Sequence, residues 1–341
     1  MMNIQPYETN SQLIQGSKLQ CPFNKDEARI FFSLVDYRNN YFISDNPEKI
    51  IEFYNGFENR DQLIQWMKER PKGVHTIHEV EGDKDVIVVI PTADYNGKYA
   101  KECRENIFKG LHIIFVVSGN GNFYFNYAHN CNVGIEKAME YNPKWIVLSN
   151  DDMVKIDDIN ILRNNLESLD SKVVSVVFTE PLGYHSVYNK VTRRNWFLKK
   201  YFILKSETFG KTINLLLDKF SADIAIVRNF GFRKYFTAKG YSYVDFIDFN
   251  VFSNDFLNEN THLFDENFIN EKEDSDLSLS IATNKIISAR IKYKIGDLIG
   301  STLGTGPDRD LRSIASTIYF DYKWKNLVEK RNLVKERGTF P

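Results

Sequence analysis

Beginning near residue 85, short apolar runs alternate with stretches of helical periodicity, and this pattern restricts the folds that the chain can adopt. The runs are rich in β-branched residues and almost unbroken in apolarity, as strands covered on both faces should be. The predicted strands are Val86–Ile90, Ile113–Val117, Trp145–Leu148 and Val173–Val177. Helices are predicted between them over 97–109, 131–141 and 157–168. This alternation predicts an α/β fold with a mostly parallel sheet, whose ligands bind beyond the carboxyl ends of the strands.

The region before this alternation carries no chemical motif that we recognise. Before it, apolar residues recur at helical spacing after Asn46-Pro47, and a second helix is predicted over 61–70. Later elements are predicted at Ala222–Val227, Val244–Phe252, 275–284 and Ile286–Tyr293, and the last 30 residues look helical. We therefore predict an N-terminal helical addition over 1–80, the main domain over 81–305 and a C-terminal helical extension over 306–341.

Composition excludes several classes of protein. The formal net charge of -1 over 341 residues gives no reason to expect nucleic-acid binding. The 3 cysteines are too few for a disulfide framework, which favours a reducing compartment. We see neither the pattern of a signal peptide nor an apolar run of the roughly 20 residues that span a bilayer. The expectation is a cytoplasmic protein that at most contacts a membrane surface.

The first predicted strand ends in Pro91-Thr92-Ala93-Asp94. Because proline cannot continue a central strand, we predict a turn at this point on the carboxyl edge. Exposed backbone groups and the Asp94 carboxylate would then face a nucleotide. The alternative is an ordinary turn that carries no ligand.

The third predicted strand is followed by Asn150-Asp151-Asp152. Two adjacent carboxylates would repel each other, and burying them unpaired would be costly. A hard divalent cation bound through oxygen removes that cost and can also hold a diphosphate. The alternative is a solvated loop in which one of the aspartates caps the next helix.

A third acidic segment, FDENFINEKEDSDL over 264–277, leads into a predicted helix. Asp274 lies near the start of that helix, where the helix dipole favours a carboxylate and keeps it ionised, as a general base must be. The same preference is also compatible with a solvated acidic loop that does no chemistry.

The order PT…N, NVGIEKA, LSNDDM and FDENFINEKEDSDLSL resembles that of family 2 glycosyltransferases of the glycosyltransferase A fold, such as rhamnosyl- and galactofuranosyl-transferases. The similarity covers roughly residues 85–305. It implies a Rossmann-like catalytic domain and an inverting mechanism. The implied donor is a nucleotide-diphosphate sugar, and the implied acceptor is a hydroxyl of a glycan or of a lipid-linked molecule.

The resemblance also implies roles for individual residues. Asp152, with Asp151 or Asn150, would hold Mg²⁺ or Mn²⁺ on the donor diphosphate, where the metal neutralises the departing nucleotide. Asp274, with Glu273 beside it, would take the proton from the acceptor hydroxyl.

Further residues match the donor-binding segments of the family. Pro91, Thr92 and Ala93 would lie along the nucleotide. Asn132 and Gly134 match the segment that packs under the donor.

The chain departs from the family pattern at three places. The second strand ends in Val117-Ser118 without the usual acid that reads the nucleotide, and Asp94 is a candidate substitute. The metal triplet begins with Asn150 instead of aspartate. A metal-binding histidine is absent before Gly300-Ser301-Thr302, so that Asp297 becomes the candidate ligand, with a direct contact from Lys294 to phosphate as the alternative.

Residues 190–211 interleave basic and aromatic side chains, which suits peripheral contact with an anionic membrane. The alternative is a solvated basic face whose aromatic rings turn into the core. Two rival functions also stay open. A sugar nucleotidyltransferase would need a glycine-rich basic loop after the first strand, where only Gly97 and Lys98 occur. A non-catalytic nucleotide-sugar-binding protein is favoured by the missing acid and the missing histidine.

Overall fold

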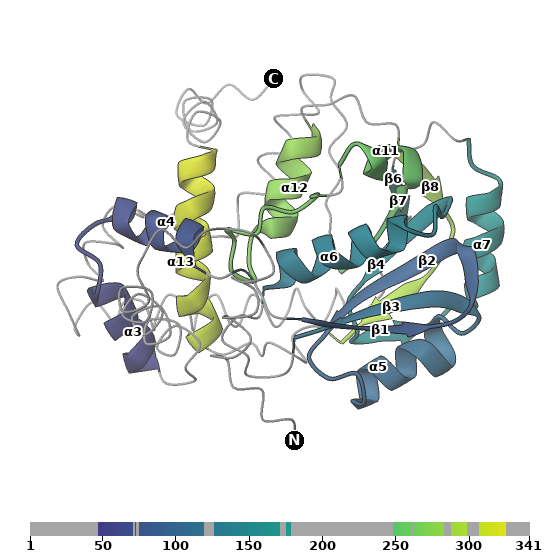
Figure 1. Ribbon diagram of the computed structural model, residues 1–341, viewed down its shortest axis with the longest axis horizontal. Coiled ribbons are helices and arrows are strands. Elements are labelled where there is room, and N and C mark those ends of the chain that lie inside the picture. Colours follow the sequence, from purple (N-terminus) through teal and green to yellow (C-terminus); the bar gives the residue numbers. More distant parts are fainter. Residues whose placement is uncertain are drawn as a thin grey trace, which may run out of the picture.

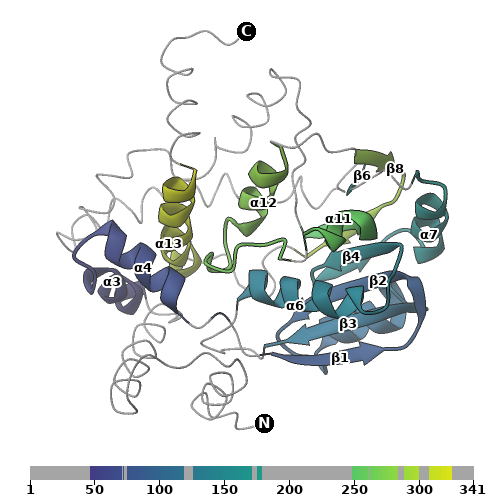
Figure 2. The ribbon, with the colours of Figure 1, turned by 45° about the horizontal axis from the view of Figure 1, so that its top comes forward.

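The computed structural model of the protein combines a seven-stranded sheet with a group of helices beside it (Figures 1 and 2). It describes residues 47–70, 72, 75–118, 126–170, 175–178, 248–260, 262–282, 288–298 and 307–324. The predicted strand Ala222–Val227 and the basic aromatic segment 190–211 lie outside these residues. Within the described ranges, no helix has both the length and the apolar character needed to cross a membrane.

The sheet has the strand order β1-β3-β2-β4-β7-β6-β8. Its strands are β1 (Thr76–Val80), β2 (Asp83–Thr92), β3 (Leu111–Val117), β4 (Trp145–Ser149), β6 (Ser175–Phe178), β7 (Phe249–Ser253) and β8 (Ser288–Ile291). β2 runs parallel to β3 and β4, and β6 runs parallel to β8, whereas β1 and β7 are antiparallel to their neighbours. The α/β class is confirmed. The sheet is mixed: β2, β3, β4, β6 and β8 run in one direction, as a mostly parallel sheet requires, whereas β1 and β7 run in the other. The reversed direction of β1 and β7 was not predicted, because an apolar run does not encode the direction of its strand.

Helices cover both faces of the sheet (Figure 1). One face carries α5 (Lys98–Glu102), the π-helical turn η1 (Cys103–Ile107) and α7 (Ile159–Glu167). The other carries α6 (Tyr127–Met139), α11 (Asn254–Asn258) and α12 (Glu273–Ala282). In β2, Val86 and Val88 pack on the first face and Ile87 and Val89 on the second. Burial on both faces explains why this strand is apolar without alternation.

The turn predicted after the first strand is present, but it begins later than expected, because β2 continues through Pro91 to Thr92 and the chain turns at Asp94–Gly97. Pro91 pairs with Val116 of β3, whereas the pairing of β2 with β4 ends at Val89. Pro91 therefore lies where the strand has a neighbour on one side only, and a missing N–H is tolerated at such a position.

Three helices, α3 (Pro47–Asn55), α4 (Arg60–Glu69) and α13 (Pro307–Lys323), pack together in what we call the helical cluster. Its core is rich in aromatic side chains from all three helices. The Tyr54 hydroxyl donates to the Leu311 carbonyl at 2.6 Å and accepts the Ala315 N–H at 3.0 Å. The N-terminal addition and the C-terminal extension thus share one core, whereas β1, within the predicted addition, belongs to the sheet.

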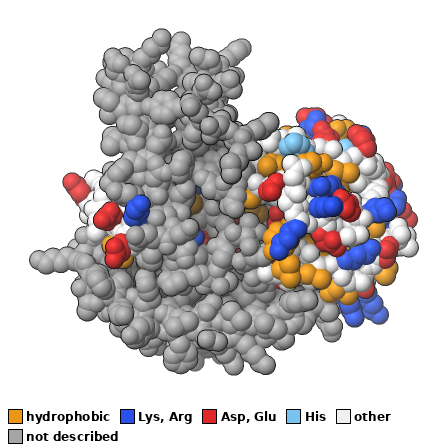
Figure 3. All heavy atoms as spheres, turned by 90° about the horizontal axis from the view of Figure 1, so that it is seen from below, with side chains coloured by type: hydrophobic (Ala, Val, Ile, Leu, Met, Phe, Trp, Pro, Cys, Tyr) orange, Lys and Arg blue, Asp and Glu red, His pale blue; other side chains and the backbone are white. Residues whose placement is uncertain are grey.

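On the face shown in Figure 3, acidic and basic side chains are interspersed over the described surface. Among the exposed ion pairs, Lys144 lies 2.7 Å from Asp85, and Lys155 lies 3.3 Å from Asp158. Such solvent-exposed pairs contribute little to stability. Their mixture of signs accords with the small net charge of the chain.

Candidate functional site

Asp151 and Asp152 follow β4 after one residue, Asn150, at the edge of the sheet where ligands are expected. Their exposures are 8% and 7%, so both are buried. Thr92 Oγ1 donates a 2.6 Å hydrogen bond to Asp151 Oδ2, which ties the ends of β2 and β4 together. Burial raises the pKa of Asp151 to about 6, opposed by the Thr92 bond and reinforced by the charge of Asp152. The alternative prediction of a solvated loop at Asp151 and Asp152 is therefore wrong, because both carboxylates are buried.

A small second sheet brings Asp297 to this pair. β5 (Met153–Lys155) and β9 (Ile295–Asp297) are antiparallel, with Met153 opposite Asp297. The Leu298 N–H donates to the Asp152 carbonyl at 2.9 Å. Asp297, like the two aspartates after β4, is buried.

Adjacent buried carboxylates are the oxygen ligands that hard divalent cations prefer, so Asp151 and Asp152 fit Mg²⁺ or Mn²⁺. Within the described ranges, no three or more His, Cys, Asp or Glu side chains form a group that could hold a metal ion. The role of Asp297 as a third ligand therefore stays a prediction.

Asn150 is engaged in a chain of hydrogen bonds that links three elements. Its Oδ1 accepts the Tyr127 hydroxyl at 2.9 Å, and its Nδ2 donates to Asp248 Oδ1 at 2.8 Å. Its backbone N–H also donates to the Asp248 carbonyl at 2.8 Å. Because its side chain joins α6 to the residue before β7, Asn150 suits a structural role better than metal binding, and Asp151 is the better companion for Asp152.

Asp248 was missed by the sequence analysis. It lies within the predicted strand Val244–Phe252 and not after the carboxyl end of a strand. β7, however, is antiparallel to β4 and pairs Phe249 with Ser149. The residue before β7 therefore lies at the same edge as the residues after β4. Knowing the direction of the predicted strand Val244–Phe252 would have revealed it.

Asp274 is the second residue of α12, so its predicted position near a helix start is confirmed. Its carboxylate accepts the Ser275 N–H at 2.6 Å. Burial raises the pKa of Asp274 to about 6; the Lys272 cation opposes this rise, and the charges of Glu271 and Asp248 add to it. Asp248 thus acts on Asp274 while it also binds the residue that follows β4, which brings the two acidic motifs to one region.

The neighbours of Asp274 differ from one another in their surroundings. Glu273 is buried at the first position of α12. Asp276, in the first turn of α12, accepts hydrogen bonds from Lys323 Nζ at 2.9 Å and from Trp324 Nε1 at 2.8 Å. Asp276 is therefore bound to the helical cluster and poorly suited to accept a substrate proton.

The residues predicted to lie along the nucleotide have separate surroundings. The Thr92 hydroxyl is hydrogen-bonded to Asp151. The exposed Asp94 forms a turn, in which its carboxylate accepts the Asn96 N–H at 2.9 Å and its carbonyl accepts the Gly97 N–H at 3.1 Å. Ala93 is half-buried between them. Their contact with a nucleotide stays a prediction.

Asn132 and Gly134 hold α6 in place. Asn132 Nδ2 donates to the Phe264 carbonyl and to Glu266 Oε1, both at 2.9 Å. Gly134 lies where α6 crosses the sheet, and an added Cβ would fall well inside van der Waals contact with Val89. These contacts account for both residues by packing, and a role under the donor stays a prediction.

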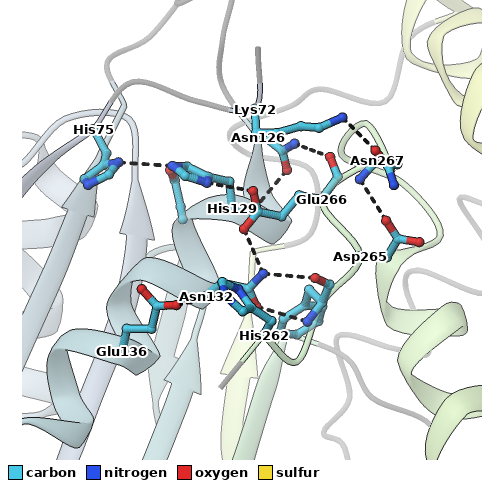
Figure 4. Close-up of polar contacts among 12 residues, drawn as sticks. Lys72, His75, Asn126, His129, Asn132, Glu136, His262, Asp265, Glu266 and Asn267 are labelled. Atoms are coloured by element: carbon cyan, nitrogen blue, oxygen red, sulfur yellow. Dashed lines mark hydrogen bonds and ion pairs between the residues drawn. The ribbon is translucent and has the colours of Figure 1, made fainter. Parts of the chain in front are cut away.

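Figure 4 shows the polar network at the start of α6. His129 Nδ1 lies 2.8 Å from Glu266 Oε2, and its Nε2 lies 3.2 Å from His75 Nδ1. Although burial would raise it, hydrogen bonds from His129 and Asn132 hold the pKa of Glu266 below its usual range. Both ring nitrogens of His129 therefore have partners, as expected of a histidine with a structural role.

Comparisons of the chain with protein-family models, with curated proteins and with solved structures found no match. The function must therefore be inferred from the motifs and from the geometry of the site. Asp151 and Asp152 lie just after β4, and the Leu298 N–H, next to Asp297, binds the Asp152 carbonyl. Asp248 binds Asn150, and its charge acts on Asp274 at the start of α12.

Proposed function

We propose that this protein is an inverting glycosyltransferase of the glycosyltransferase A type. It would transfer a sugar from a nucleotide-diphosphate donor to a hydroxyl of a glycan or lipid-linked acceptor, with Mg²⁺ or Mn²⁺. One observation carries the proposal: two acidic motifs, Asp151-Asp152 and Asp274, reach the same region, and Asp248 interacts with both sides. One motif suits the donor and the other suits the acceptor.

The donor half depends on the carboxylates after β4. Asp152 and Asp151 would hold the metal ion, which neutralises charge on the departing diphosphate when it is bound. Thr92 orients Asp151 through its hydrogen bond. Because both aspartates are buried, their charges are screened less than they would be in water.

The acceptor half depends on Asp274. Its carboxylate would take the proton of the acceptor hydroxyl as that oxygen bonds to the anomeric carbon and the bond to the diphosphate breaks. A pKa of about 6 leaves Asp274 mostly ionised at neutral pH and more basic than an ordinary aspartate, as a general base requires.

Calorimetric titration tests the donor half directly. Uridine, guanosine and thymidine diphosphates are titrated with and without Mn²⁺ into the wild-type protein, Asp152→Ala and Asp85→Ala. Asp85 is the control, an exposed carboxylate near the start of β2. The proposal expects Mn²⁺-dependent binding of at least one nucleotide, lost in Asp152→Ala and kept in Asp85→Ala. Binding that ignores the metal and Asp152 would contradict it.

Turnover assays separate the rival functions. Release of free sugar, or its transfer to an acceptor, from the nucleotide sugar that binds supports the proposal. Binding without turnover would favour a non-catalytic nucleotide-sugar-binding protein. Release of pyrophosphate from a nucleoside triphosphate and a sugar phosphate would favour a nucleotidyltransferase.

A further inference from the structure

The helix that carries Asp274 lies between the sheet and the helical cluster (Figures 1 and 2). Leu277 and Ile281 of α12 pack into the core under the sheet, whereas Leu279 packs into the core of the helical cluster. Residues four apart share one face of a helix, and the residue midway between them points the other way. Both cores therefore determine where α12 lies.

Lys323, the last residue of α13, contacts two acids on either side of Asp274 in the sequence. Its Nζ lies 2.8 Å from Asp265 Oδ2 and 2.9 Å from Asp276 Oδ2. The side chain of Asp276 is only 4% exposed, so this ion pair is shielded from water. Removing one partner of such a pair leaves a buried charge without compensation, which is far costlier than losing a surface pair.

The loop before α12 is also held by two residues that follow α4. Arg70 Nη2 donates to the Phe268 carbonyl at 3.0 Å, and Lys72 Nζ donates to Asn267 Oδ1 at 2.7 Å (Figure 4 shows the latter). Residues from both ends of the described chain thus converge on one loop, which leads directly to the proposed base.

The backbone of this loop is strained. Asn270 and Lys272 have φ values of 51° and 74°, in the left-handed region that favours glycine. Asn270 Oδ1 accepts the Tyr127 N–H at 2.8 Å, and the Ile269 N–H donates to Ser316 Oγ at 3.0 Å. Non-glycine residues keep such conformations when their surroundings impose them, and here α6 and α13 do so.

We propose that Lys323 is a positioning residue for the transfer reaction. Through Asp276 it fixes the first turn of α12, and hence the place of the Asp274 carboxylate relative to Asp151 and Asp152. This inference rests on the proposed function. It gives the helical cluster a part in catalysis, although Lys323 acts only through other residues.

Lys323→Met tests the inference, because methionine keeps much of the aliphatic stem and removes the charge. We expect kcat for transfer to fall about 10- to 100-fold, the scale for a small misplacement of a reacting group, with donor affinity unchanged. Lys323→Arg should restore most of kcat. The control is Lys137→Met, which removes an ion pair of α6 at a similar side-chain exposure, 26% against 31%, and should leave kcat unchanged.

Hydrogen exchange provides a second measurement. Lys323→Met should speed amide exchange over 264–282 and leave 86–92 of the sheet unchanged. If Lys323→Met folds poorly, the double variant Lys323→Met/Asp276→Asn also removes the buried charge of Asp276 that Lys323 neutralises, and it should still lose kcat. An active wild type whose folded variants keep kcat overturns the positioning role alone. A wild type that transfers no sugar overturns the proposed function, and the inference with it.

Discussion

The sheet and the helical cluster support the two halves of the proposed site by different means. The sheet places Asp151 and Asp152 through its main chain, because β4 ends there and the Leu298 N–H binds the Asp152 carbonyl. The cluster supports Asp274 largely through side chains, among them that of Lys323. Substitutions in the helical cluster should therefore affect the acceptor half and leave the donor half unchanged.

Asp274→Asn is expected to have the largest effect and to sharpen this comparison. Removing the base should lower transfer by about 10²–10⁴. Donor affinity should change little.

The same variant has an expected effect on stability. Because burial raises the pKa of Asp274 to about 6, the ionised carboxylate destabilises the folded state above that pH. Asp274→Asn should therefore be at least as stable as wild type at pH 7.5. Donor titration, transfer kinetics and thermal unfolding measure the three quantities. Transfer near the wild-type rate would give the role to Glu273, whereas lost donor binding would erase the difference between the halves.

Asp152→Ala should lower transfer by about 10²–10³, the scale for losing a strong electrostatic stabiliser of the transition state. Unlike Asp274→Asn, it should also weaken metal-dependent donor binding, because the lost carboxylate belongs to the donor half. Kinetics at saturating Mn²⁺, with Asp85→Ala as the control, test this expectation. Full activity of the wild type in excess chelator would exclude a metal role for the residue.

Gly134→Ala should disturb the sheet side of the molecule. Its new Cβ would collide with Val89 and lie 3.0 Å from Val116 Cγ2, and overpacking of this kind costs about 1–3 kcal/mol. Urea unfolding measures the loss in the free energy of unfolding. Glu136→Ala, on the exposed side of the same helix, should change it by less than about 0.5 kcal/mol. Equal effects of the two substitutions would mean that α6 does not pack on the sheet as described.

Tyr54→Phe should weaken the helical cluster by about 1–2 kcal/mol, because the hydroxyl that joins α3 to α13 is lost. Transfer should slow while donor binding is kept. Hydrogen exchange of α13, together with both assays, measures these effects, and Tyr322→Phe, at an exposed position of the same helix, is the control. Weaker donor binding in Tyr54→Phe would show that the cluster supports both halves.

The pH dependence of kcat provides a further test of the acceptor half. At saturating donor and metal, kcat should fall about tenfold for each pH unit below about 6, because protonated Asp274 cannot accept a proton. Above pH 6 the carboxylate is ionised and kcat should level off. A pH-rate profile from 4.5 to 8 measures this. A kcat that is constant between pH 5 and 7 would contradict Asp274 as the base.

Local patterns in the chain were sufficient to predict the central strands β2, β3 and β4. The predicted runs Ile113–Val117 and Trp145–Leu148 lie within β3 and β4, because burial on both faces leaves an unbroken apolar signature. The predicted helix 97–109 is instead α5 followed by the π-helical turn η1. Apolar spacing cannot distinguish this change of hydrogen-bond register from a continuous helix.

The candidate site divides in the same way. Local order in the chain predicts that Asp151 and Asp152 follow a strand and that Asp274 lies near the start of a helix. The contacts of Asp248 with Asn150 and of Lys323 with Asp276 are visible only once the chain is folded. Those contacts depend on the direction of β7 and on the packing of α13, which no local pattern encodes, since they arise between segments that meet only when both cores have formed.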